Sequence, residues 1–144
     1  MNDPLTQNRY QTTEQRVVYH NNGAYINASA PKTKAYMAAL LASLSNHVQA
    51  LSAGCESKPD FTIHVVSHAA GLDLFAIVEN DEALRTRYDA LREQGVRFLV
   101  CANTMRARNL SVDDLCGVSE RDIVPSGVAE LAHLQMQGFA YIHF

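Results

Sequence analysis

The chain lacks the features that mark several common protein classes. Its three cysteines, Cys55, Cys101 and Cys116, are odd in number and form no CxxC pair, which argues against a disulfide framework or a zinc site. No apolar run approaches the roughly 20 residues of a membrane-spanning helix, and residues 1–15 contain no apolar core of a signal peptide. We therefore expect a cytoplasmic protein that holds no metal ion and contacts no membrane.

Nucleotide and nucleic-acid ligands also lack their usual sequence signatures. The chain contains neither the GxGxxG motif of dinucleotide-binding proteins nor a GxxxxGKS or GxxxxGKT phosphate-binding loop. Its formal net charge of -3 provides no basic surface for nucleic acid. We expect no cofactor and no nucleic-acid partner.

Length and composition are those of one globular domain. The chain has 144 residues, of which 47% are hydrophobic and 19% charged, enough to form a core without disulfides. Residues 1–15 are polar and are expected to form a flexible N-terminal tail. No linker or repeat divides residues 16–144, which we expect to form the single domain.

Short strand patterns alternate with helical patterns along this domain. A continuous β-branched run such as 61–66 is typical of a buried parallel strand, whereas apolar residues three and four apart indicate one face of a helix. The predicted strands are 16–20, 61–66, 96–101, 121–124 and 139–143, and the predicted helices lie within 31–54, 71–77, 82–95, 102–108, 112–117 and 127–138. This alternation predicts an α/β fold with three α/β/α layers around a mostly parallel five-stranded sheet.

Ligands of open parallel sheets bind outside the carboxyl ends of the strands, so the residues at those ends are the candidate site. The order of the strands is left open by the pattern. The candidates are His20, Asn21, His68, Cys101, Asn103 and Ser126.

Cys101 is the most informative of these residues. It stands where the apolar strand 96–101 stops and a helix can begin, and N–H groups at the start of a helix favour the thiolate form of a cysteine. Cysteine is also a small hydrophobe that often ends a buried strand. Both readings, a reactive thiol and a structural core residue, follow from the pattern.

Two long segments, Val96–Asn109 and Val124–Phe144, resemble the DsrE/DsrF-like family of sulfur-relay and related small proteins. The strand, cysteine and following basic helix around Cys101 are similar to those of the family, as is the stretch from Ile123 to Leu131. The resemblance implies a five-stranded parallel-sheet domain that assembles into homo-oligomers, often trimers or hexamers. It also implies that Cys101 carries persulfide sulfur, as a sulfurtransferase or a sulfur carrier working between donor and acceptor proteins.

The remaining candidates have supporting roles in this interpretation. His20 or His68 could stabilise the Cys101 thiolate or shuttle a proton, although each is also an ordinary loop histidine. Asn21 and Asn103 could hydrogen-bond a persulfide, but asparagine at such positions commonly caps the backbone. Ser126 is first of all expected to cap the helix that follows it.

Two other functions remain open from the sequence. One is a non-enzymatic, homo-oligomeric binding module for a small anion or a nucleotide-like ligand, with Cys101 structural. The other is an assembly protein with an inert cysteine, suggested by the apolar final strand, which as a sheet edge would need covering or pairing.

Overall fold

The computed structural model describes residues 3–4, 7, 9–10, 14–25, 27–55 and 59–144. Residues 1–2, 5–6, 8 and 11–13 of the predicted tail lie outside the described residues, so the flexibility of that tail stays a prediction. No helix in the described part of the chain is both long enough and apolar enough to cross a membrane.

Five parallel strands run through the centre of the protein in the order β4-β3-β2-β1-β5. The strands are β1 (Gln15–Asn21), β2 (Phe61–Ser67), β3 (Arg97–Cys101), β4 (Ile123–Val124) and β5 (Ala140–His143). The helices are α1 (Ala30–Ser52), α2 (Asp73–Asn80), α3 (Glu82–Glu93), α4 (Ala102–Ala107) and α5 (Gly127–Met136). The predicted parallel α/β architecture is therefore confirmed.

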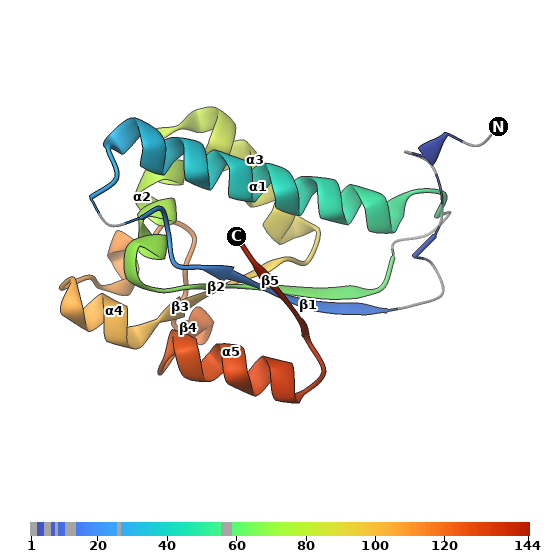
Figure 1. Cartoon of the computed structure of the whole chain (residues 1–144). Helices are drawn as coiled ribbons and strands as arrows, with labels where there is room; N and C mark the ends of the chain where they lie inside the picture. Colours follow the sequence, from blue (N-terminus) through green and yellow to red (C-terminus); the bar gives the residue numbers. More distant parts are fainter. Residues whose placement is uncertain (1–2, 5–6, 8, 11–13, 26, 56–58) are drawn as a thin grey trace.

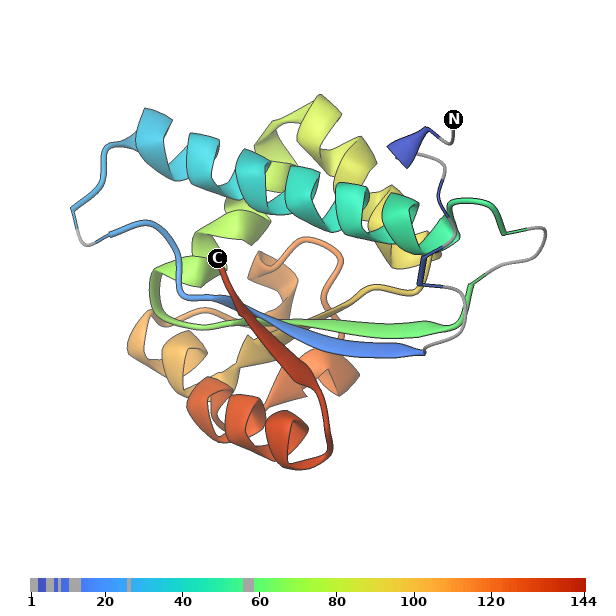
Figure 2. The ribbon, with the colours of Figure 1, turned by 45° about the vertical axis from the view of Figure 1, so that its right-hand side comes forward.

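Helices cover both faces of the sheet, with α1, α2 and α3 on one side and α5 on the other (Figures 1 and 2). Side chains alternate between the two faces along a strand. Val17 and Tyr19 accordingly point into the larger core beneath α1, whereas Val18 points toward α5. A smaller core of five buried residues lies on the α5 side: Val18, Val66, Leu99, Leu131 and Leu134.

Two predicted elements are shorter than expected. The helix predicted within 112–117 is a 3-10 turn at Val112–Asp114, and the fourth strand contains only Ile123 and Val124. In both places a serine closes a tight turn with the aspartate three residues later, Ser111 with Asp114 and Ser119 with Asp122. These capping boxes satisfy the backbone locally, which removes the need for a longer element.

Asn21 joins the ends of β1 and β2. The residue is fully buried, and its side-chain amide donates to Ser67 Oγ (3.0 Å) and to the Gly71 carbonyl (3.1 Å). Its Oδ1 accepts from the Gly23 N–H, and its own carbonyl accepts from the His68 N–H. A Cβ on Gly71 would lie only 2.0 Å from the Asn21 carbonyl oxygen, so this close approach requires glycine.

We expect Asn21→Ala to lower the free energy of unfolding by about 2 kcal/mol or more, because buried donors and acceptors lose their partners. Denaturation in urea measures this change. Asn22→Ala is the matched control on the neighbouring, partly exposed residue, where we expect a change within about 0.5 kcal/mol. Equal effects of the two substitutions would show that the amide of Asn21 does not hold the strand ends together.

Candidate active site at the carboxyl edge of the sheet

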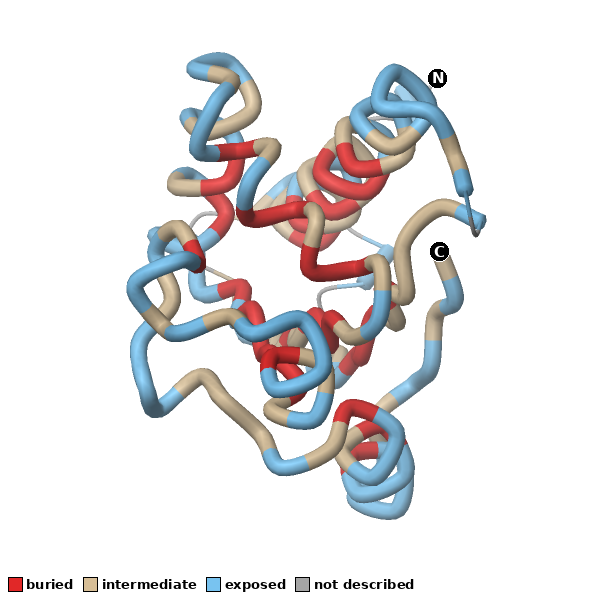
Figure 3. The backbone as a smooth tube through the Cα atoms, turned by 90° about the vertical axis from the view of Figure 1, so that its left-hand side faces the viewer, coloured by how far each residue is buried: buried red, intermediate tan, exposed pale blue. Residues whose placement is uncertain are grey.

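Four adjacent strands place reactive side chains side by side at the carboxyl edge of the sheet, which Figure 3 shows end-on. His20 pairs with His143 of β5 on one side and with Val66 of β2 on the other. Ser67 pairs with Val100, so the residues that follow them, His68 and Cys101, are also neighbours. Every second residue of a strand shares a face, and all four side chains therefore lie on the α5 side.

Cys101 ends this row, and its thiol is surrounded by hydrogen-bond donors. The residue is only 5% exposed, and burial by itself raises the pKa of its thiol. The N–H groups of Gly127, Thr104 and Asn103 and the hydroxyl of Thr104 donate to the sulfur and more than offset burial, so the pKa lies below its ordinary value. The site therefore favours the thiolate.

Thr104 is held in place by the loop that follows β2. Its Oγ1 accepts from the N–H of Ala69 at 2.9 Å, which leaves the hydroxyl hydrogen for the sulfur. Ala69 itself has a positive φ of 51°. Arg108 fixes the same loop, donating to the Ala69 carbonyl and pairing with Asp73 at 2.7 Å.

Gly127, the first residue of α5, lies between Cys101 and His68. A Cβ at this position would come within 2.9 Å of His68 Cβ and 3.3 Å of both His68 Cγ and Cys101 Cβ. Because glycine has no such atom, its N–H can approach the sulfur closely. His68 Cγ, from which the imidazole ring extends, and Cys101 Cβ therefore both lie beside Gly127.

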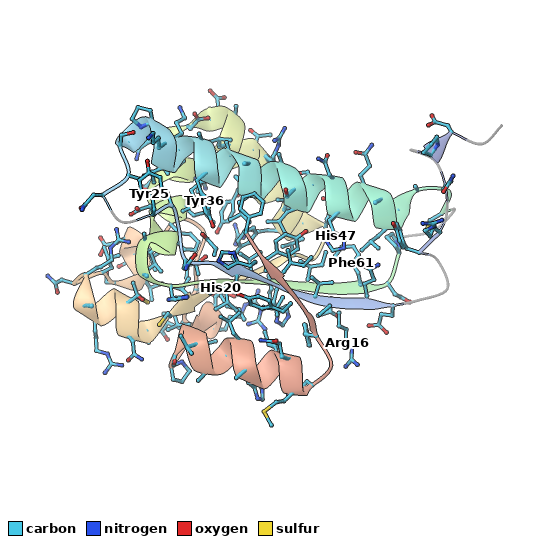
Figure 4. The ribbon with its side chains drawn as sticks, in the orientation of Figure 1. Arg16, His20, Tyr25, Tyr36, His47 and Phe61 are labelled. Carbon is cyan, nitrogen blue, oxygen red and sulfur yellow. The ribbon has the colours of Figure 1, made fainter. Side chains whose placement is uncertain are left out.

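His20, labelled at the end of β1 in Figure 4, lies at the centre of a hydrogen-bonded chain. Its Nε2 is 2.6 Å from Nε2 of His68, and its Nδ1 is 2.5 Å from the Tyr141 hydroxyl. The ring of His143 packs edge-on against it, with centroids 5.3 Å apart.

His20 and His68, the two histidines of this hydrogen-bonded chain, are uncharged at neutral pH. Burial, followed by the proximity of His68 and His143, lowers the pKa of His20 to about 4. Burial also lowers the pKa of His68. Each ring at neutral pH therefore carries one hydrogen and offers one acceptor nitrogen.

The other predicted site residues have structural partners. Asn21 is occupied by the strand-end bonds described above. The Asn103 side chain accepts from Arg106 at 2.9 Å, while its backbone N–H faces the sulfur. Ser126 caps α5 by accepting from the Ala129 N–H at 3.1 Å, as expected.

Four residues of the site were missed from the sequence: Thr104, Gly127, Tyr141 and His143. Thr104 and Gly127 each stand at or near the first turn of a helix that follows a strand, which is a weak signal. Tyr141 and His143 join the site only because β5 pairs with β1. The order of the strands was the missing information.

Cys116 lies on the far side of the sheet from Cys101. It packs against the larger core beneath α1, and burial raises the pKa of its thiol despite nearby Arg85. Cys101 and Cys116 form no disulfide in the described part of the chain. Among the described residues, no three His, Cys, Asp or Glu side chains are placed to share a metal ion.

Comparison with known proteins assigns the chain to a family. Residues 12–144 match the model of the DsrE/DsrF-like family. The chain belongs to this family. Its fold is also similar to that of a solved structure of MTH1491, a protein of unknown function from Methanobacterium thermoautotrophicum. The two sequences are 30% identical, the TM-score is 0.67, and the match covers 91% of this chain and 100% of that one. No curated protein matches the chain.

We expect Thr104→Val to slow alkylation of Cys101 by iodoacetamide about tenfold at neutral pH, because a hydrogen bond to a charged group contributes roughly 1.5–3 kcal/mol. The rate, followed by mass spectrometry across pH, measures the fraction of thiolate. Thr104→Ser keeps the hydroxyl and should retain most of the rate. An unchanged rate in Thr104→Val would exclude the hydroxyl as a donor to the sulfur.

Stability should decrease as the solution becomes acidic. The folded pKa of His20, about 4, lies below the unfolded value near 6.5, so the unfolded chain binds this proton first. The contribution is complete above pH 6.5 and is lost as the pH falls through this range toward 4. Urea midpoints between pH 7.5 and 4 measure the decline, and His20→Asn should make it shallower. Parallel curves for the two proteins would contradict a neutral, partly buried His20.

Proposed function

We propose that this protein is a sulfur carrier in which Cys101 accepts sulfur from a donor persulfide and passes it to an acceptor thiol. The observation that carries the proposal is the set of donors on the sulfur, the N–H groups of Gly127, Thr104 and Asn103 with the Thr104 hydroxyl. Four donors around one thiol stabilise negative charge there. Membership of a family associated with sulfur relay agrees with this chemistry.

The transfer consists of two exchanges at Cys101. In the first, the Cys101 thiolate attacks the outer sulfur of a donor R–S–SH, the S–S bond of the donor breaks, and R–S⁻ leaves and takes up a proton. In the second, an acceptor thiolate attacks the outer sulfur of Cys101–S–SH, and Cys101 leaves as thiolate. No electrons are gained or lost overall, so no oxidant is needed.

The same donors serve both exchanges. A lowered pKa increases the fraction of attacking thiolate, and it also makes Cys101 the better leaving group when sulfur is passed on. The Cys101 side chain is buried, which limits the access of solvent oxidants to its sulfur. A sulfur carrier must both accept and release sulfur readily, and a lowered pKa of the carrier thiol helps both steps.

A binding module with a structural Cys101 is the second candidate function, and one observation favours it. An open groove of about 550 Å³ at the same edge of the sheet is lined by Tyr25, Lys32, Tyr36 and His143 among others. Figure 4 shows Tyr25 and Tyr36 beside the start of α1. A lysine among aromatic rings suits a small anionic ligand with an apolar part.

We further propose that the protein acts in the cytoplasm as a homo-oligomer, a trimer or a hexamer, with separate donor and acceptor proteins. Support comes from the unpaired outer edge of β5 in the described chain and from exposed apolar side chains on α5, Val128 and Met136. Such edges and patches are commonly covered by a partner.

Incubation with a cysteine desulfurase and cysteine should add about 32 Da, one sulfur atom, to Cys101. Peptide mass spectrometry locates the addition, which dithiothreitol should remove. Cys101→Ser is the matched control and should stay unloaded although Cys55 and Cys116 remain. Loading of neither Cys101 nor any other residue, across desulfurase, polysulfide and thiosulfate donors, would refute the sulfur carrier and favour the binding module.

A further inference from the structure

A hydrogen-bonded chain of side chains runs from beside the buried Cys101 to the outside of the protein. Its inner end is His68, whose ring root lies against Gly127 together with Cys101. Its middle is His20, and its outer end is Tyr141, 42% exposed on the edge strand β5. Both internal contacts, 2.5 and 2.6 Å, are short enough for direct transfer of a proton.

The hydrogen-bonded side chains of Tyr141, His20 and His68 can adopt two arrangements that differ only in the positions of hydrogens. In one, the Tyr141 hydroxyl donates to His20 Nδ1, His20 Nε2–H donates to His68 Nε2, and His68 carries its hydrogen on Nδ1. In the other, His68 carries its hydrogen on Nε2 and donates it to His20 Nε2, and His20 carries its hydrogen on Nδ1 and donates it to the Tyr141 oxygen. The Tyr141 hydrogen then points to water, and His68 Nδ1 is an acceptor. Both arrangements keep every ring neutral.

We propose that Tyr141, His20 and His68 form a proton relay that serves sulfur exchange at Cys101. This inference rests on the proposed function and adds what the donors around the sulfur do not supply. Those donors stabilise the Cys101 thiolate, but the other thiol of each exchange must gain or lose a proton inside a largely buried site.

Protons balance over one full cycle. During loading, His68 Nδ1–H gives its proton to the departing R–S⁻, His20 and Tyr141 each pass one proton inward, and Tyr141 takes one from water. During unloading, the acceptor R′–SH gives its proton to His68 Nδ1, and the shifts run outward to water. The relay is then in its original arrangement.

The low pKa of His20 favours transfer of a proton through the ring over a stable, positively charged imidazolium. Burial and the neighbouring His68 and His143 disfavour an added proton on this ring, so a proton that enters at one nitrogen leaves at the other. His143 packs against His20 without a hydrogen bond to it among the described contacts. Its position is that of an electrostatic neighbour rather than a member of the relay.

The experiment compares two disulfide substrates of Cys101 that differ in the leaving thiol. An aromatic disulfide, 5,5′-dithiobis(2-nitrobenzoate), releases a thiolate that needs no proton, whereas bis(2-hydroxyethyl) disulfide releases a basic alkyl thiolate. In Tyr141→Phe and His20→Gln, we expect exchange with the alkyl disulfide to slow by about tenfold or more. Exchange with the aromatic disulfide should stay within about twofold, because the Cys101 thiolate itself is unchanged.

Two substitutions elsewhere serve as matched controls. Tyr10→Phe removes a hydroxyl from a tyrosine of similar exposure, 41%, and His133→Gln removes an imidazole from α5. Both should leave both rates unchanged. Free imidazole should restore alkyl exchange in His68→Ala, which a merely structural role of His68 does not predict.

The outcomes separate the relay from the proposed function. An equal loss with both disulfides, or no loss with either, overturns the relay even if Cys101 loads with sulfur. A selective loss with the alkyl disulfide in a protein that loads no sulfur supports the relay and refutes the sulfur carrier.

Discussion

Parallel pairing of the strands is the constraint on which the site depends. In the order β4-β3-β2-β1-β5, every strand points the same way, so residues from distant parts of the sequence end at one edge. The buried amide of Asn21 holds two of these ends in register. Without that alignment, Cys101, His68, His20 and Tyr141 would be unrelated residues of four separate segments.

The chemistry at Cys101 follows from a competition between two physical effects. Burial disfavours a charged sulfur, and oriented donors favour it, and here the donors prevail. They come from two helix starts, α4 and α5, which converge only because Gly127 has no side chain to separate them. The neighbouring His20 and His68 are partly buried, which lowers the pKa of both rings and keeps them neutral. The two environments therefore favour the charged form of the Cys101 thiol and the neutral form of the imidazoles beside it.

The fold was largely predictable from the sequence, but the site was only partly so. The strand patterns and helix faces were clear because apolar residues such as Leu40, Leu41 and Leu44 are spaced for one helical face. Cys101 was also found, because its place at the end of a strand is visible in the chain. Tyr141 was not, because its contact with His20 spans 121 residues. Such long-range contacts depend on the order of the strands, which local patterns do not encode.

The separation of Cys101 from Cys116 by the whole thickness of the sheet has a consequence for the proposed transfer of sulfur. Cys116 packs into the opposite core, and Cys55 follows the far end of α1. A persulfide on Cys101 thus has no thiol of its own chain with which to form a disulfide and expel hydrogen sulfide. In the proposed sulfur carrier, release of the outer sulfur therefore requires an acceptor thiol from another molecule.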